Sequence, residues 1–247
     1  YYRDHWVEID EARLENYEAM FEWHPRMAPL LQSADLQAGQ QVVDYGCGPG
    51  GLSVELARRV GSGGSVLGVD LNADMVSLAH ARAARERPGA AIDFEQIEHD
   101  RIPRDDDSVD RLVCKSVLEY VTDPASNIAE FARVTKPGGR VHVIDSDWHM
   151  LVAEPLDDVT LAALFEAANH AYRTPRIGRR LYGLMREAGL VDIDVRVLAA
   201  ADTEGVRAPI LFHMVGYARE AGTLSGAVLD AIEARIEAGL RDDRFLL

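Results

Sequence analysis

The 247-residue sequence has only two cysteines, and it lacks long apolar runs. Cys47 and Cys114 form neither a CxxC pair nor a cysteine and histidine spacing typical of zinc sites, which argues against a disulfide framework and a metal site. No stretch approaches the apolar length of a membrane span, and the charged start YYRDHWVEID is unlike a signal peptide. We therefore expect a cytoplasmic protein with no membrane partner.

Positive charge is also scarce, because 26 lysines and arginines face 41 acidic residues and leave a formal net charge of -15. A surface of this sign repels phosphate backbones, and the one local concentration of basic residues comprises Arg173, Arg176, Arg179 and Arg180. We expect no nucleic-acid partner. The length and the 47% hydrophobic content fit one domain with one substantial core.

Short β-branched runs alternate with helical patterns through most of the chain. The patterns predict strands over 41–45, 65–70, 91–97, 109–115, 140–146 and 191–198, and helices over 51–60, 73–86, 125–135 and 158–188, the last with a break near RTPRIG. This order predicts an α/β fold with a doubly wound, mainly parallel sheet. We divide the single domain 1–247 into a helical N-terminal lid (1–36), a core (37–198), and a helical lid insertion with the start of a last strand (199–247).

The first predicted strand runs into the glycine-rich stretch VVDYGCGPGG, residues 42–51. Gly46, Gly48 and Gly51 satisfy GxGxxG, which by itself is a weak indication of a dinucleotide. Asp44 argues against one, since a carboxylate about 4 Å from a pyrophosphate charge costs roughly 4 kcal/mol at an effective dielectric near 20. The same carboxylate stabilises a cation.

Asp70 ends the second predicted strand, where an acid can accept hydrogen bonds from both hydroxyls of a ribose. Ligands in doubly wound sheets bind beyond the carboxyl ends of the strands, so Asp44 and Asp70 should face the same site. S-adenosylmethionine (SAM) matches this pair, with an ammonium and a sulfonium at one end and a ribose at the other. The alternative for each acid is a turn or helix-cap role.

Four stretches in order then carry a family resemblance: VVDYGCGPGGLSVELA, VLGVDLNADMVSLA, IPRDDDSVDRLVCKSVLEYVTDP and ARVTKPGGRVHVIDSDW. Across residues 37–198 the chain resembles class I SAM-dependent methyltransferases, in particular those of ubiquinone and menaquinone biosynthesis. The resemblance implies a Rossmann-like fold, SAM as cofactor, and cofactor contacts at Asp44, Tyr45, Gly46, Cys47, Gly48, Gly50, Asp70, Leu71, Glu98, His99, Lys115 and Ser116. The family's adenine-binding aspartate falls on Glu98, and Asp100 is the alternative.

The expected reaction moves a methyl group to an O, N or C atom of a small, apolar or aromatic metabolite. His149 is our first choice for a general base, with Asp147 to orient it, and His24 and His213 are further candidates. The acidic run at 105–107 reads as a solvated turn rather than a metal site.

Three other functions stay open. The chain can bind SAM without transferring the methyl group, as a cyclase or an assembly partner, because fold and motif identify the cofactor and not the reaction. An RNA methyltransferase is disfavoured by the net charge. An NAD-dependent reductase is disfavoured by Asp44.

Overall fold

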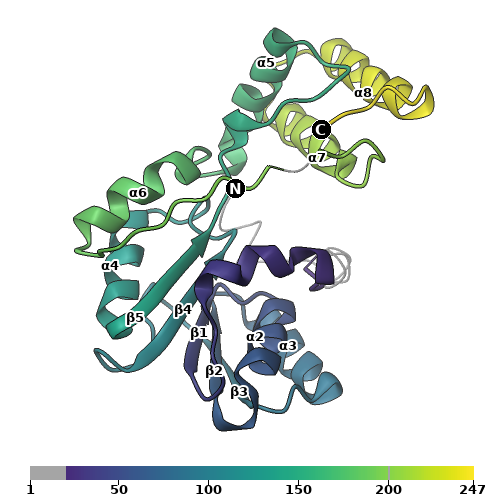
Figure 1. The fold of residues 1–247 in the computed structure, drawn as a ribbon. Helices are drawn as coiled ribbons and strands as arrows, with labels where there is room; N and C mark the ends of the chain where they lie inside the picture. The colour runs from purple at the N-terminus through teal and green to yellow at the C-terminus, as the bar shows by residue number, and fades with distance from the viewer. Residues whose placement is uncertain (1–20, 200) are drawn as a thin grey trace. The chain divides into compact units, whose positions relative to one another are not determined.

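The computed structural model describes residues 21–199 and 201–247, which form two compact units. The sheet unit contains residues 21–145 and 180–194, and the helical unit contains residues 146–179, 195–199 and 201–247. Figure 1 shows both units, with the strands in the sheet unit and α5, α7 and α8 in the helical unit. Each unit is described by itself below.

The sheet has five parallel strands in the order β3-β2-β1-β4-β5. Their bounds are Gln41–Tyr45 (β1), Ser65–Asp70 (β2), Ala91–Gln96 (β3), Val109–Lys115 (β4) and Thr135–Ile144 (β5). The strand order turns back between β1 and β4, so the crevice at the carboxyl ends of these two strands is the expected ligand position. The predicted doubly wound α/β fold is confirmed.

Helices cover the sheet on both faces (Figure 1). They are α2 (Gly51–Val60) and α3 (Ala73–Glu86) on one face and α4 (Pro124–Val134) on the other. Alternate residues of β1 point to opposite faces. Asp44 accordingly contacts Ser53 of α2, whereas the ring of Tyr45 packs edge-on against Phe131 of α4.

Two helices of the sheet unit begin at short polar side chains that cap them. Asn72 Oδ1 accepts hydrogen bonds from two backbone N–H groups in the first turn of α3, and Asp123 caps α4 in the same way. Because these caps follow β2 and the β4 loop directly, they fix where each chain segment turns away from the carboxyl edge of the sheet. Before β1, the segment Pro25–Ala34 forms a 3₁₀ helix, η2.

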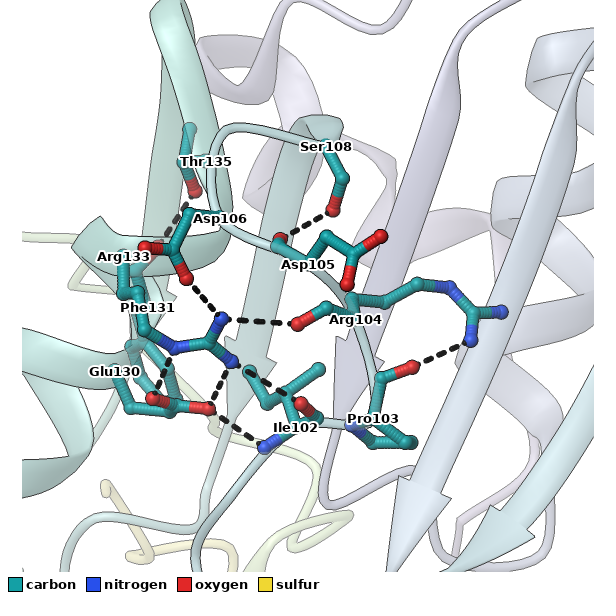
Figure 2. Close-up of polar contacts among 10 residues, drawn as sticks. All are labelled: Ile102, Pro103, Arg104, Asp105, Asp106, Ser108, Glu130, Phe131, Arg133 and Thr135. Carbon is teal, nitrogen blue, oxygen red and sulfur yellow. Dashed lines mark hydrogen bonds and ion pairs between the residues drawn. The ribbon is translucent and has the colours of Figure 1, made fainter.

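The turn before β4 is held to α4 by one arginine (Figure 2). Arg133 donates to the carbonyl of Ile102 at 3.2 Å and to Asp106 at 2.6 Å, and it pairs with Glu130 on its own helix. Asp106 remains mostly exposed. Among the residues that the structure describes, no group of three or more His, Cys, Asp and Glu side chains is placed to hold a metal ion.

The prediction of a sixth strand over 191–198 is wrong. These residues lie outside any strand, and the side chains of Val195 and Val197 are 62% and 74% exposed. An alternating apolar pattern indicates one apolar face, but a strand also needs a backbone neighbour to pair with, and the pattern does not reveal whether one is present. The fifth strand also differs, since it begins at Thr135 and ends at Ile144 rather than running from 140 to 146.

The helical unit contains α5 (Asp158–Ala168), α7 (Ala208–Ala221) and α8 (Gly226–Arg241). Short 3₁₀ turns occupy Trp148–Met150 (η4) and Asn169–Ala171 (η5), and α6 (Ile177–Glu187) starts in this unit and continues into the sheet unit. Helices α5 and α8 both pack on α7, whose Leu211 and Met214 are fully buried. None of the described helices combines the length and apolarity that crossing a bilayer requires.

Candidate cofactor site

A pocket of about 1200 Å³, counting the open space at its mouth, lies in the sheet unit at the carboxyl ends of β1, β2 and β4. Nine of its lining residues are among those that the resemblance implies: Asp44, Tyr45, Gly46, Cys47, Gly48, Asp70, Leu71, Lys115 and Ser116. The remaining lining residues come largely from the segment before β1 and from the stretch after β4. The sequence therefore predicts most of the pocket's floor.

The glycine loop after β1 is closely packed at Gly46 and open at Gly48. Gly46 has a φ of 73°, and a Cβ there would lie 2.3 Å from a methyl carbon of Val117, so a larger residue would displace the loop. A Cβ on Gly48, by contrast, would meet no atom within 4 Å. Open space at Gly48 is what a ligand needs to approach the backbone.

Two side chains from neighbouring elements hold this loop. Asp70 Oδ2, at the end of β2, accepts a hydrogen bond from the backbone N–H of Gly48 at 2.9 Å. Arg82, a buried residue of α3, donates from Nε to the carbonyl oxygen of Pro49 at 2.9 Å. The loop is thus fixed from one side by a carboxylate and from the other by a guanidinium.

Asp44 is a buried acid with half of its hydrogen-bonding capacity unused. Its side chain is 1% exposed, and Oδ2 accepts a hydrogen bond from Ser53 Oγ at 2.5 Å. Oδ1 is buried and has no hydrogen-bond partner among the described residues. Burial raises the pKa of Asp44 to about 7; Asp70 adds to this rise, while Ser53 and Lys115 oppose it. A ligand cation at Oδ1 would satisfy this oxygen and favour its ionised form.

Asp70 also has a raised pKa, mainly because burial disfavours its charge. The backbone N–H groups of Asn72, Gly48 and Leu71 oppose the rise. Two acids at neighbouring strand ends fit a ligand that brings a positive charge to Asp44 and ribose hydroxyls to Asp70. They do not fit a pyrophosphate, so the donor set agrees with SAM and disagrees with a dinucleotide.

A second cavity lies beside the first and shares Leu71 and Val121 with it. Glu98, His99 and Asp100 line it, in the loop after β3. Glu98 and His99 are exposed, whereas Tyr45 donates from its hydroxyl to Asp100 Oδ1 at 2.9 Å. The alternative acid, Asp100, is therefore the one that the structure fixes in place.

The predicted catalytic residues are not among the residues that line the pocket. His24 is exposed and caps η2, its Nδ1 accepting from the backbone N–H of Arg26 at 3.1 Å. His149 and Asp147 belong to the helical unit. Gly50, the remaining predicted cofactor contact, is buried behind the loop, where a Cβ would lie 2.9 Å from the Cβ of Ala79.

The expected contact between the Asp147 carboxylate and the His149 ring is not formed. Asp147 instead accepts two hydrogen bonds from Arg179, and its Oδ1 also accepts from the backbone N–H of His149 at 3.3 Å. A guanidinium fork matches a carboxylate better than one imidazole N–H does, which explains the choice of partner. His149 Nε2 is buried and has no partner among the described residues.

Ser53 and Arg82 were missed by sequence reasoning. Ser53 stands in the first turn of the helix that follows the glycine loop, where an N-terminal hydroxyl reads as helix chemistry rather than as a partner of Asp44. The signal for Arg82 was its position on the apolar side of its helix, seven residues after Met75 and three after Ala79, both buried. A charged residue at a helix position that packs into the core needs a specific polar partner there.

The comparisons with known proteins agree with this geometry. A family model described as "Methyltransferase domain" matches residues 36–189, which is more than half of the chain. The chain belongs to this family. The prediction from the motifs is confirmed: the protein is a class I methyltransferase, and its cofactor is SAM.

Two curated relatives show how far the similarity extends. The methyltransferase is 33% identical over 187 residues to a ubiquinone biosynthesis O-methyltransferase of Ralstonia nicotianae, covering 74% of this chain and 76% of that protein. It is 34% identical over 161 residues to an uncharacterized 37.1 kDa protein in transposon TN4556 of Streptomyces fradiae, covering 65% of this chain and 46% of the other.

Among solved structures, a SAM-dependent methyltransferase of Aquifex aeolicus superposes with a TM-score of 0.56 at 19% identity, covering 73% of this chain and 88% of that chain. At this identity the likeness concerns the fold alone. It agrees with the parallel sheet that the structure shows.

Proposed function

We propose that the methyltransferase transfers the methyl group of SAM to an oxygen, nitrogen or carbon atom of a small apolar or aromatic metabolite. The observation that carries this proposal is the composition of the pocket beyond the acids. Its wall is apolar and includes Phe21, Trp23, Met27, Leu52, Val117, Tyr120 and Val121. Aromatic walls bind flat apolar groups well, because large rings lose little freedom on binding and bury much area.

The wall and the acids occupy one continuous pocket. Phe21, Trp23 and Met27 come from the segment before β1, and Tyr120 and Val121 come from the stretch after β4. An acceptor held against this wall is next to a cofactor held by Asp44 and Asp70. The name of the Ralstonia nicotianae relative, an O-methyltransferase, favours oxygen among the three acceptor atoms.

Positioning supplies most of the catalysis in this account. Bound SAM supplies a methyl group on a positively charged sulfur, and this charge disappears as the methyl leaves. Asp44 holds the amino-acid end of the cofactor and Asp70 holds its ribose, so the acceptor needs only to line up with the methyl group between them, and orientation of this kind is worth about 7 to 11 kcal/mol in favourable cases. The apolar wall keeps water out, which prevents a competing acceptor from entering.

The general base in this proposal is His149, because its Nε2 is buried and unpaired within the described residues. Asp147 positions His149 by accepting a hydrogen bond from its backbone N–H. The same carboxylate also accepts hydrogen bonds from Arg179. His24 is a weaker candidate, since its Nδ1 caps η2. The lid roles of residues 1–36 and 199–247 stay predictions, and residues 1–20 lie outside the described part of the chain.

The test is a screen with methyl-labelled SAM against paired acceptors: phenols, aromatic amines and enolic carbons, each with a polar counterpart of similar size. We expect label on an apolar ring acceptor. Trp23→Ala should raise the acceptor KM by about tenfold, because a buried aromatic contact is lost, and leave the SAM affinity within about twofold. Tyr182→Ala removes an exposed ring and is the matched control. Label that appears on RNA, or on no acceptor, would contradict the proposal.

A further inference from the structure

Lys115 ends β4 and lines the cofactor pocket together with Asp44. The register between β1 and β4 places Asp44 opposite Val113, and Lys115 is two residues further along the same strand. Because side chains alternate between faces along a strand, Lys115 and Asp44 point to the same face of the sheet, the one covered by α2. The pocket therefore presents one carboxylate and one ammonium side by side.

The chain contains only two lysines, and their surroundings differ. Lys136 pairs with Asp110 at 2.8 Å near the start of β5. Lys115 Nζ donates to Ser116 Oγ at 3.3 Å, and within the described part of the chain it forms no ion pair. One long hydrogen bond to a neutral hydroxyl leaves most of the donor capacity of this amino group unused.

Burial and the neighbouring acids act on the pKa of Lys115 in opposite directions. Burial lowers its pKa, and the nearby acids Asp44, Glu119 and Asp145 oppose that effect. A half-buried ammonium that no described carboxylate reaches within ion-pair distance is unfavourable, and a ligand that brings a carboxylate to it relieves this. Asp44 has the complementary need, because its Oδ1 has no partner among the described residues.

We propose that Lys115 binds the carboxylate of the amino-acid end of SAM while Asp44 binds its ammonium, so that the two side chains select ligands carrying an intact amino acid. The ammonium and the carboxylate of this group sit on one carbon, so recognising both needs two opposite charges close together. This inference rests on the cofactor site described above and is independent of the acceptor.

Two ligands that differ at this end test the proposal by calorimetric titration. S-adenosylhomocysteine (SAH), the demethylated cofactor, keeps the amino acid, whereas 5′-methylthioadenosine lacks it. Lys115→Gln should weaken SAH binding by about tenfold, the size expected for one charge-assisted hydrogen bond, and change 5′-methylthioadenosine binding by less than about twofold. Lys115→Arg should restore most of the SAH affinity.

A third ligand separates the two charges. Decarboxylated SAM keeps the ammonium and lacks the carboxylate, so it should bind Lys115→Gln at least as tightly as it binds the unaltered protein. Lys136→Gln is the matched control and should leave all three affinities unchanged. Equal weakening of SAH and 5′-methylthioadenosine would overturn the proposal in favour of a structural role, and unchanged SAH binding would overturn it outright. Failure of the unaltered protein to bind SAH would overturn the cofactor site itself, whereas failure to methylate any acceptor would count only against the proposed function.

Discussion

The two acids at the cofactor pocket and three acids of the helical unit have opposite surroundings. Asp44 and Asp70, at strand ends of the sheet unit, have raised pKa values because burial outweighs their hydrogen bonds. Asp147, Asp157 and Asp202, in the helical unit, have lowered pKa values. Burial thus outweighs the hydrogen bonds of the two acids at the pocket, whereas hydrogen bonds and charge outweigh burial for the three acids of the helical unit.

The partners of the helical acids explain the difference. Asp202 accepts hydrogen bonds from the backbone N–H groups of Glu204, Val206 and Arg207, which overcome the effect of its burial on the pKa. Asp147 has Arg179, whose hydrogen bonds and charge likewise outweigh burial. Acids of this kind stabilise the fold and need no ligand. An acid that folding leaves unsatisfied marks the place where a ligand supplies the missing partner.

His149 is the exception to this comparison, because its Nε2 is buried in the helical unit and has no hydrogen-bond partner among the described residues. As general base, His149→Ala should lower turnover by about 100-fold, the lower range for removal of an acid–base group, and leave SAH affinity within about twofold. Steady-state kinetics with a working acceptor, paired with calorimetry, measure both quantities. Turnover that survives in His149→Ala and falls in His213→Ala would move the base to α7.

Asp70→Ala removes the acid that accepts a hydrogen bond from Gly48 and that we propose binds the ribose. The SAH affinity should fall by about 30- to 100-fold, because a charge-assisted contact to the ligand and the hold on the glycine loop are lost together. Asp202→Ala, the matched change in the helical unit, should lower the melting temperature and leave SAH affinity within about twofold. An unchanged SAH affinity in Asp70→Ala would contradict the ribose assignment.

Asp44→Asn tests the unsatisfied acid itself, and its effect should depend on pH. The folded pKa is about 7 against an ordinary 3.8, so in the ligand-free protein the stability due to the protonated form is complete below about pH 4 and is lost as the pH rises through 7. Binding of a ligand ammonium needs the ionised form, so SAH affinity should rise with pH over the same range.

The asparagine variant should therefore be more stable than the unaltered protein at pH 8, by on the order of 4 kcal/mol, and should bind SAH about tenfold more weakly there. The two proteins should become equally stable only near pH 4, the ordinary pKa of the acid, whereas their SAH affinities should approach each other once the pH falls below about 7. Denaturant titrations and calorimetry at several pH values check this. A difference that is constant from pH 5 to 8 would show that Asp44 does not titrate in this range.

Backbone elements and side-chain partners differ in how well the sequence predicts them. Strands β1 and β2 and helices α2 and α3 were predicted with their observed bounds, because each has a continuous apolar core or a clear cap such as Asn72. The pocket floor followed from the same elements, since strand ends in a parallel sheet meet at one edge. For these elements the local sequence pattern and the observed fold agree.

Partner choice was out of reach from the sequence. The sequence pattern does not indicate that Asp147 pairs with Arg179 rather than with His149. It also does not indicate that the Arg82 side chain donates a hydrogen bond to the carbonyl of Pro49 in the glycine loop. The stretch 191–198 alternated as a strand should, yet pairing depends on a neighbour that the stretch itself does not specify. Trp23 was expected in a lid, and the structure places it in the pocket wall.

The most direct test of the central claim is a calorimetric titration of the unaltered protein with SAH and with NADH under the same conditions. A buried, half-satisfied carboxylate at the end of β1 should accept the ligand that carries an ammonium and reject the one that carries a pyrophosphate. We predict one-site binding of SAH and no measurable binding of NADH. Binding of NADH as tight as that of SAH, and competition between the two, would contradict the account.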